Sequence, residues 1–265
     1  IEAIGALILI ISYLPSLGFS SIWTGIFTSI SAFCNAGFDI FKEGSSLTNY
    51  VGNGIVNFVV MALIVIGGIG FMTWYDFSQY KFNLKKYRLQ SKIILMTTAI
   101  LIILPTLYFF FYEFQQPQWA NLSLWERICA SLFAAVTPRT AGFNTVDLTK
   151  LTDTSQGLTI ILMLIGGAPG STAGGFKVTT IALIYLAIRS AFHHCENIPA
   201  FDRQIPNTTL RPAVVILSLY LGAFLIGGTL ISIIDSVPLW PCLFETASAL
   251  GTVGLSLGIT SSLSW

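Results

Sequence analysis

Long stretches of this 265-residue chain contain no charged side chain. Three of them run over 51–75, 93–112 and 212–234, and each could cross a bilayer core, which needs about 20 apolar residues. Charged residues make up 9% of the chain, whereas an ordinary soluble domain carries about 25%. A soluble domain, a disordered chain, a coiled coil and a nucleic-acid-binding protein are therefore disfavoured, and the sequence predicts a polytopic membrane protein.

Two further apolar segments are interrupted. The segment 3–38 is too long for one span, and Pro15 within it predicts a spanning helix that ends before Pro15 and a shorter helix after Ser21. The segment 154–188 is broken by a glycine-rich stretch and by Lys177. A basic side chain inside a bilayer costs about 2.5–3.5 kcal/mol on insertion scales, so we expect Lys177 beside an aqueous path or a carboxylate.

Basic side chains gather in two loops, 76–92 and 189–211. Cytoplasmic loops carry an excess of lysine and arginine, so both loops are expected to face the cytoplasm. Four tryptophans that fall on the other side would then lie at the outer interface, namely Trp23, Trp119, Trp125 and Trp240.

A glycine-centred motif occurs three times in the chain. Its copies are FCNAGFD at 33–39, PRTAGFN at 138–144 and LGTVGLS at 250–256. Each follows a short apolar segment, predicted to be helical over 21–33, 123–137 and 241–250, that is too short to span a bilayer. Ser123 with Glu126 predicts a capping box, and Pro241 suits a first helical position. The repeating unit is therefore a spanning helix, a short helix, a glycine-centred strand and a second spanning helix.

This arrangement suits a cation filter. Irregular backbone at membrane depth is tolerated where it lines a watery cavity, and its carbonyls can replace the hydration shell of K⁺. Glycine permits the left-handed conformations that turn carbonyls toward an axis, and the C-terminal end of each short helix favours a cation. The predicted filter, which would bind K⁺ through backbone carbonyls, consists of Cys34, Asn35, Ala36, Gly37, Thr140, Ala141, Gly142, Thr252, Val253 and Gly254.

With their flanking residues, SAFCNAGF at 31–38, TPRTAGFNT at 137–145 and SALGTVGLS at 248–256 resemble the second, third and fourth pore loops of the Trk/Ktr/HKT potassium transporter superfamily, closest to its bacterial Trk/Ktr branch. The resemblance implies four units around one pore, so the chain is expected to lack the first unit and the last spanning helix. It also implies a multi-pass protein of the bacterial plasma membrane, a homodimer, and a cytoplasmic nucleotide-binding regulatory subunit. K⁺ would be the transported ion, with no covalently bound cofactor and with Na⁺ left open as an activator.

The predicted fold is an all-α membrane protein with K⁺-channel-like units of helix, pore loop and helix around one pore. The chain divides into a second pore unit over 1–75, a cytoplasmic loop over 76–92, a third pore unit with a broken second helix over 93–188, a cytoplasmic loop over 189–211, and a truncated fourth pore unit over 212–265.

The break at 166–177 reads GGAPGSTAGGFK. A nucleotide-binding loop is disfavoured because the GxxxxGK[ST] spacing is absent. A flexible kink between two half-helices accounts for the glycines, and the family resemblance further implies an intramembrane gate below the filter. The predicted gate residues are Gly166, Gly167, Gly170, Ser171, Gly174, Gly175 and Lys177.

Arg139, at the predicted filter mouth, has two interpretations. It could repel cations, but bracing of the loop against Glu126, Glu245 or Asp147 is favoured. Glu126 and Glu245 are themselves either braces or mouth charges. The run His193 to Glu196 offers metal-ligating atoms, but adjacent helical residues point in different directions, so a cytoplasmic loop is expected there.

The sequence thus predicts the pore-forming subunit of a potassium uptake system, and not an enzyme. One alternative is the potassium-translocating subunit of an ATP-driven pump, which shares this pore architecture. A second, from another class, is an intramembrane serine hydrolase acting through Ser171, which would need a base within hydrogen-bond reach. The two histidines, His193 and His194, lie far from Ser171 along the helix.

Overall fold

The computed structural model of the chain describes residues 1–41, 46–193, 197–201 and 203–263. This part of the chain is mostly helical, as predicted, and its only strands form one small hairpin. Seven short 3-10 helices lie in the connections, at Thr48–Tyr50, Leu84–Lys86, Glu113–Gln115, Pro117–Trp119, Leu148–Lys150, Asn207–Thr209 and Thr260–Ser262.

The first helical pair is α1 (Glu2–Leu17) and α2 (Ser20–Phe33). The prediction that the first helix ends before Pro15 is wrong, because Pro15 lies inside α1. A proline removes one helical hydrogen bond, yet α1 continues to Gly18. Gly18 adopts φ 55°, and its N–H donates to Leu14 O at 3.1 Å. The left-handed glycine, and not the proline, ends the helix.

The apolar stretch 51–75, expected to be long enough to span a bilayer, is not one straight helix, because two helices occupy this region. Helix α3 (Gly54–Gly68) and helix α4 (Phe71–Tyr80) are bent by 98° relative to each other. Between them Gly70 has φ 84°, and a Cβ atom added there would lie 2.7 Å from Pro169 O. The bend therefore needs glycine for its conformation and for its close contact with the segment around Pro169.

The middle of the chain contains the long helix α5 (Leu89–Phe111), the short helix α6 (Leu124–Val136), and the two halves of the predicted broken helix, α7 (Asp153–Leu164) and α8 (Val178–Phe192). The predicted capping box is confirmed: Ser123 Oγ accepts from Glu126 N, and Glu126 accepts from Ser123 N at 2.8 Å. The break is also confirmed, because residues 165–177 are not helical.

Strands β1 (Ile198–Ala200) and β2 (Arg203–Ile205) pair antiparallel, with Ile198 opposite Ile205. This hairpin lies in the second basic loop and was not predicted. The long helix α9 (Leu210–Asp235) and the short helix α10 (Leu239–Gly251) follow. Pro241 is the third residue of α10 and not its first, but the first turn tolerates proline because its N–H groups have no helical partner.

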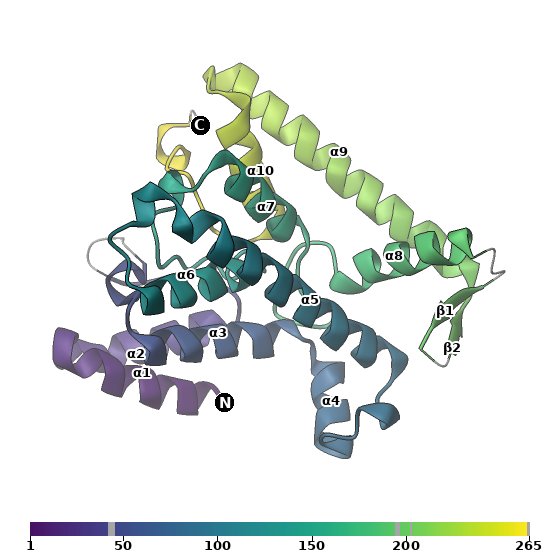
Figure 1. Cartoon of the computed structure of the whole chain (residues 1–265), viewed down its shortest axis with the longest axis horizontal. Helices are drawn as coiled ribbons and strands as arrows, with labels where there is room; N and C mark the ends of the chain where they lie inside the picture. The colour runs from purple at the N-terminus through teal and green to yellow at the C-terminus, as the bar shows by residue number, and fades with distance from the viewer. Residues whose placement is uncertain (42–45, 194–196, 202, 264–265) are drawn as a thin grey trace.

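Each short helix that precedes a glycine-centred loop packs against the helix before it, so that α2 lies on α1, α6 on α5 and α10 on α9. Figure 1 shows the purple α1–α2 pair at one end of the molecule, the yellow-green α9–α10 pair at the other, and α5 with α6 between them. Helices α5 and α9 meet the length and hydropathy of membrane spans, and the α3–α4 pair would add one more if it is a single span.

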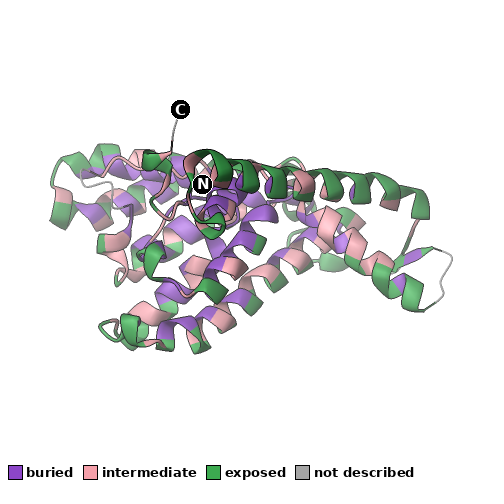
Figure 2. Cartoon of the chain, turned by 90° about the horizontal axis from the view of Figure 1, so that it is seen from above, coloured by how far each residue is buried: buried purple, intermediate pink, exposed green. Residues whose placement is uncertain are grey.

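The outer helices expose apolar side chains. Only 11% of the most apolar window of α9 is buried, and Ile226, Leu230 and Ile233 on that helix are each more than half exposed. Figure 2 shows buried residues toward the centre and exposed residues along the outer helices. Because an apolar surface of this extent is not stable in water, the helices face lipid or other protein.

The buried carboxylate of Glu113 links the end of α5 to the start of α7. It accepts hydrogen bonds from Trp119 Nε1 at 2.8 Å, Thr152 Oγ1 at 2.6 Å and Ser155 Oγ at 2.6 Å. Hydrogen bonds to a charged group contribute about 1.5–3 kcal/mol.

We expect Glu113→Gln to lower the free energy of unfolding by about 2 kcal/mol and the thermal midpoint with it. The matched variant Glu126→Gln, at a half-buried helix cap, should lose less; an equal loss would contradict this role of Glu113.

Candidate functional site

The three glycine-centred loops converge. A Cβ atom added to Gly37 would lie 2.4 Å from Ala141 O, and one added to Gly142 would lie 2.2 Å from Val253 O. On Gly254 the added atom would be 3.9 Å from Gly142 Cα. Segments that are far apart in the sequence therefore touch through their backbones, and at two of the three glycines no other residue fits without displacing a carbonyl.

Each loop contains two left-handed residues that are separated by one residue. They are Asn35 and Gly37 (φ 52° and 73°), Thr140 and Gly142 (65° and 79°), and Thr252 and Gly254 (54° and 90°). Positive φ is a genuine outlier for β-branched threonine and costs about 1–3 kcal/mol. Asn35, Thr140 and Thr252 belong to the predicted filter, but their left-handed conformation was not predicted, although each stands two positions before an aligned glycine. Ala36, Ala141 and Val253 lie between the left-handed pairs.

The short helices α2 and α10 end in the same way. Asn35 N donates to Ala32 O at 3.2 Å and Ala36 N to Ser31 O at 2.9 Å. After α10, Thr252 N donates to Ala249 O at 3.1 Å, and Val253 N donates to Ser248 O at 2.8 Å. Both pairs are Schellman motifs, in which a left-handed residue closes the helix. The predicted filter residue Cys34 is the last residue before this turn.

Helix α6 ends differently. Pro138 has no N–H to donate, and Ala141 N donates to Thr137 O at 3.0 Å. The left-handed residue Thr140 nevertheless stands at the same distance before its glycine as Asn35 and Thr252 do. Three helix ends thus lead into loops of one conformation.

A hydroxyl at the end of each short helix braces its loop. Ser31 Oγ donates to Phe38 O at 2.8 Å, and Thr137 Oγ1 donates to Phe143 O, the equivalent carbonyl of the second loop. In the third loop, Gly254 N donates to Ser248 Oγ at 3.1 Å. These bonds fix the backbone beside the central glycine of each loop.

Glu245 is a brace for the segment after the third loop. Its carboxylate accepts from Ser256 Oγ at 2.8 Å, Leu257 N at 2.9 Å and Thr260 Oγ1 at 2.8 Å. Glu126 is likewise committed to its helix cap. Of the two interpretations left open for these carboxylates, the structure therefore favours the brace.

The expected partners of Arg139 are wrong. Its side chain is 5% exposed and donates from Nη2 to Thr98 Oγ1 at 3.3 Å, and it forms no ion pair with a described residue. Glu126 and Glu245 are occupied elsewhere, and Asp147 binds Thr149 and Lys150. The arginine instead lies beside a small cavity that is also lined by Val136 and Gly167. The Arg139 side chain therefore lies between the second loop and the glycine-rich break.

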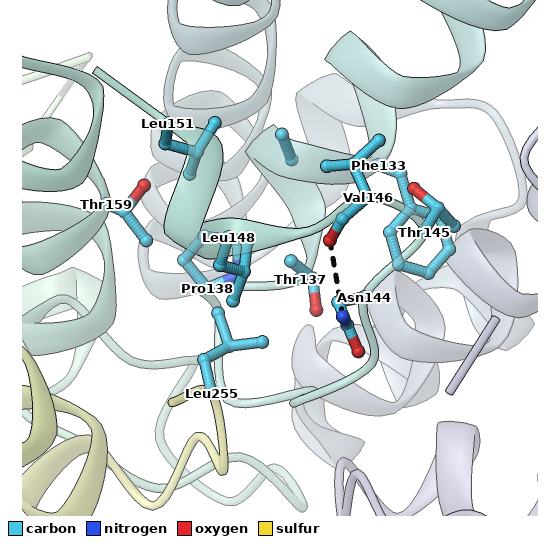
Figure 3. A pocket seen from close by; sticks show the side chains of 11 residues that line it. Phe133, Thr137, Pro138, Asn144, Thr145, Val146, Leu148, Leu151, Thr159 and Leu255 are labelled. Atoms are coloured by element: carbon cyan, nitrogen blue, oxygen red, sulfur yellow. Dashed lines mark hydrogen bonds between the residues drawn. The ribbon is translucent and has the colours of Figure 1, made fainter. Parts of the chain in front are cut away.

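Apolar side chains fill the space behind the second loop. Figure 3 shows Val146, Leu148 and Leu151 gathered with Leu255 of the third loop, and the hydrogen bond from Asn144 Nδ2 to Val146 O at 3.2 Å. The cavity between them measures about 10 Å³, which is at most the size of one water molecule. This layer supports the loops and leaves no room for a ligand.

The glycine-rich break lies against two of the three loops. Thr172 Oγ1 donates to Asn35 Oδ1 at 3.0 Å and approaches Phe33 O at 3.1 Å. A Cβ atom added to Gly174 would lie 1.8 Å from Thr252 Oγ1. Asn35 Nδ2 in turn donates to Arg139 O at 3.2 Å. The predicted gate and the predicted filter are therefore one contact network, with Asn35 at its centre.

The break closes on itself at its base. Gly166 N donates to Phe176 O at 2.9 Å, and Val178 N donates to Gly167 O at 3.0 Å. A Cβ atom added to Gly166 would lie 1.9 Å from Gly174 O, so the two sides of the loop are in direct contact. Gly170, at the tip, has open space only where a Cβ atom would stand, and Gly175 has φ 67°.

The bend between α3 and α4 holds the tip of this loop, a contact that the sequence analysis missed. Ala168 N donates to Gly68 O at 2.9 Å, Thr172 N to Gly67 O at 3.4 Å, and Phe71 N to Gly170 O at 3.0 Å. The three glycines at 67, 68 and 70 were the available signal, since glycine inside a helical pattern often has a packing reason.

Lys177 has carbonyl partners. Its Nζ donates to Ala173 O at 2.7 Å and is 3.5 Å from Gly174 O, so the expected carboxylate is absent among the described residues. Ser171 Oγ donates to Ala168 O at 2.6 Å and accepts from Ala173 N at 3.3 Å. The Ser171 hydroxyl thus stabilises the turn between Ala168 and Ala173. Of the run at 193–196, positions 194–196 lie outside the described residues.

The structure is that of a pore-loop membrane protein. It has three helix pairs, each followed by a glycine-centred loop, and the glycine-rich break packs against two of these loops. Residues 3–265 match the family model of TrkH, described as "Cation transport protein". The chain therefore belongs to the TrkH family of cation transport proteins.

Relatives of known name support this membership. The chain is 35% identical to the potassium/sodium uptake protein NtpJ of Enterococcus hirae and 36% identical to the Ktr system potassium uptake protein B of Bacillus subtilis. Each alignment covers 99% of this chain and 59% of the relative, so the chain spans about three-fifths of their length. The structure also matches the potassium transporter TrkH of Vibrio parahaemolyticus with a TM-score of 0.74 at 19% identity, over 98% of this chain and 55% of that one.

The comparisons confirm the predicted family, the helical pore-loop fold and the multi-pass location in a membrane of bacterial type. The family is one of transport proteins. The assignment of individual residues to filter and gate, and the division into pore units, remain predictions.

Proposed function

We propose that the chain contributes three of the pore loops of a potassium uptake subunit, and that K⁺ passes along backbone carbonyls of these loops. The observation that carries the proposal is the convergence of three loops with the same pair of left-handed residues. In an extended strand, successive carbonyls point to opposite sides. A left-handed residue at every second position removes this alternation, so that successive carbonyls can point to the same side, toward the ion. The names of the relatives, a potassium/sodium uptake protein and a potassium uptake protein, support K⁺ as an ion that passes.

The loops favour a cation in three ways. Their carbonyl oxygens replace water around the ion. The C-terminal ends of α2, α6 and α10 each contribute about half a negative charge. The hydroxyl braces and the glycine contacts hold the carbonyls in place, so little reorganisation accompanies ion entry. K⁺ is the transported substrate, Na⁺ is a candidate activator, and the protein carries out no chemical reaction.

The glycine-rich break is the proposed gate. It contacts Asn35 of the first loop and Thr252 of the third. A small movement of the break therefore changes its contacts with the proposed filter loops. A segment of this kind is withdrawn when its contacts in the open position outweigh those in the closed one. The backbone bonds to Gly67, Gly68 and Phe71 make the α3–α4 bend part of the same moving unit.

Removal of the Thr172 hydroxyl tests this coupling. Thr172→Val keeps the shape of the side chain but removes its bonds to Asn35 Oδ1 and Phe33 O. A hydrogen bond contributes about 1 kcal/mol, so the open fraction of a mostly closed gate should rise about fivefold, and K⁺ flux with it. The control Thr229→Val loses a similar bond to Leu225 O on an exposed face of α9. Equal fluxes in both variants would contradict a role of Thr172 in closure.

Reconstitution separates the proposal from its alternatives. The full-length protein alone in liposomes should take up K⁺ along its gradient without ATP. Uptake only with ATP and a catalytic partner would instead indicate the pump subunit. Labelling of Ser171 by a serine-reactive probe would indicate a hydrolase, which we do not expect because the Ser171 hydroxyl is bonded within its own turn.

The proposed assembly is a homodimer in a bacterial cell membrane with a cytoplasmic nucleotide-binding regulatory subunit. The basic loops would face that subunit. In a background without native cysteines, Lys85→Cys should react only with reagents that reach the cytoplasm. Lys150→Cys, equally exposed at the other face, should react from outside. Labelling of position 85 in intact cells by an impermeant reagent would invert the topology.

A further inference from the structure

A basic cavity lies outside the pore loops, between the two cytoplasmic loops. It measures about 410 Å³, and Lys85, Lys86, Lys92 and Arg203 line it together with Tyr80 and Phe201. The 3-10 helix Leu84–Lys86 contributes two of these basic side chains, and the first turn of α5 and strand β2 contribute one each. Figure 1 shows the hairpin and the segment after α4 on the same side of the molecule.

These charges are not neutralised within the described part of the chain. The described ion pairs are Arg88 with Asp76 and Lys150 with Asp147, and neither involves a cavity residue. Lys92 Nζ lies 5.8 Å from the centre of the Phe201 ring, a cation–π contact. No described residue that lines the cavity is acidic. Four like charges around one cavity repel one another, and an anion between them would relieve that repulsion.

We propose that this cavity binds a phosphate group, and that the phosphate belongs to the headgroup of an anionic phospholipid. Lysine and arginine are the usual side chains for phosphate, and a 410 Å³ cavity falls within the usual size range for small-molecule sites. Basic pockets at the cytoplasmic ends of spanning helices bind lipid headgroups through this chemistry.

Two features favour a lipid over a free phosphate. The cavity lies at Leu89, where the spanning helix α5 begins, and therefore at the depth of the headgroups. Exposed apolar side chains occur in the segments that form it: Phe201, in the lining, is 53% exposed, and Phe82 and Leu84, just before Lys85 in the chain, are 87% and 57% exposed. A soluble anion gains nothing from exposed aromatic and aliphatic side chains, whereas the glycerol and acyl parts of a lipid would cover them.

The test compares two variants of equal charge in the full-length, detergent-purified protein. One carries Lys85→Gln, Lys92→Gln and Arg203→Gln, so that each element around the cavity loses one charge. The control carries Lys150→Gln, Arg189→Gln and Arg211→Gln, which are exposed residues outside the cavity. Native mass spectrometry then measures binding of phosphatidylglycerol and of neutral phosphatidylcholine. Gel filtration and thermal unfolding check that both variants are folded.

A basic residue close to an anionic headgroup contributes about fivefold to binding, and the three control residues do not line the cavity that would hold the headgroup. We expect the cavity variant to bind phosphatidylglycerol roughly 100-fold more weakly, the control to stay within about twofold, and phosphatidylcholine to bind equally to all. Equal phosphatidylglycerol binding by both variants would overturn the proposal. Displacement of the lipid by millimolar inorganic phosphate would assign the cavity to a free anion and overturn the lipid assignment. The outcome does not depend on K⁺ transport, so it is independent of the proposed function.

Discussion

Gly142→Ser is expected to reduce K⁺ uptake by at least about tenfold and to lower the K⁺/Na⁺ permeability ratio. Gly142 has φ 79° and its added Cβ atom would lie 2.2 Å from Val253 O. The variant must therefore either strain its own backbone, at about 1–3 kcal/mol, or displace a carbonyl of the third loop. Both changes disturb the oxygens that we propose to bind K⁺. Uptake and permeability ratios in liposomes measure the effect.

Two other glycines make this prediction specific. Gly222 on α9 has open space and no left-handed conformation, so Gly222→Ser should leave uptake and selectivity unchanged. Gly254 has φ 90°, but a Cβ atom added there would lie 3.9 Å from Gly142 Cα, an ordinary van der Waals contact. Gly254→Ser should therefore strain its own backbone without displacing a carbonyl, and show a smaller loss. Unchanged selectivity in Gly142→Ser would contradict the assignment of this loop to a filter.

Deletion of residues 169–173 is expected to raise K⁺ flux severalfold while leaving selectivity largely intact. The deletion removes the tip that bonds to Phe71 N and the Thr172 contact with Asn35, and these contacts hold the proposed gate closed. The filter carbonyls lie elsewhere and remain. The deletion joins Ala168 to Gly174, and the two sides of the loop are already in contact there, because a Cβ atom added to Gly166 would lie 1.9 Å from Gly174 O. Flux into liposomes at matched protein incorporation measures the change.

The regulatory response provides a second readout of the same deletion. A partner that acts through α8, which begins directly after the break at Val178, would lose its effect once the obstruction is gone. A folded deletion variant that conducts no faster than the parent and still responds fully to its partner would contradict the gate. The break would then be only a kink between α7 and α8.

The repeat in the sequence was sufficient to predict the pore-loop architecture. Glycine at 37, 142 and 254 after short apolar segments identified three equivalent loops, and the structure brings them together. The capping box at Ser123 was predictable because it depends on two residues three positions apart. Features of this kind depend on residues that are close together in the sequence, so they can be predicted without knowledge of tertiary contacts.

Features that depend on tertiary contact were not predictable in the same way. Pro15 is compatible with either the end or the interior of a helix, and the packing of α1 on α2 decides between them. The 98° bend at Gly70 reflects the loop that inserts against it. Arg139 was expected to meet a carboxylate, but each candidate carboxylate has local partners. The direction of a side chain at a loop follows from the left-handed turn beside it, which hydropathy does not encode.

The most direct test of the account is to locate the ion. Crystals of the full-length protein grown with Rb⁺ in place of K⁺ should give an anomalous difference peak between the three loops, within coordination distance of carbonyl oxygens of the Asn35–Gly37, Thr140–Gly142 and Thr252–Gly254 segments. The peak should weaken in Gly142→Ser and persist in Gly222→Ser. An Rb⁺ peak elsewhere in the membrane region, with none among these carbonyls, would contradict the filter that we propose.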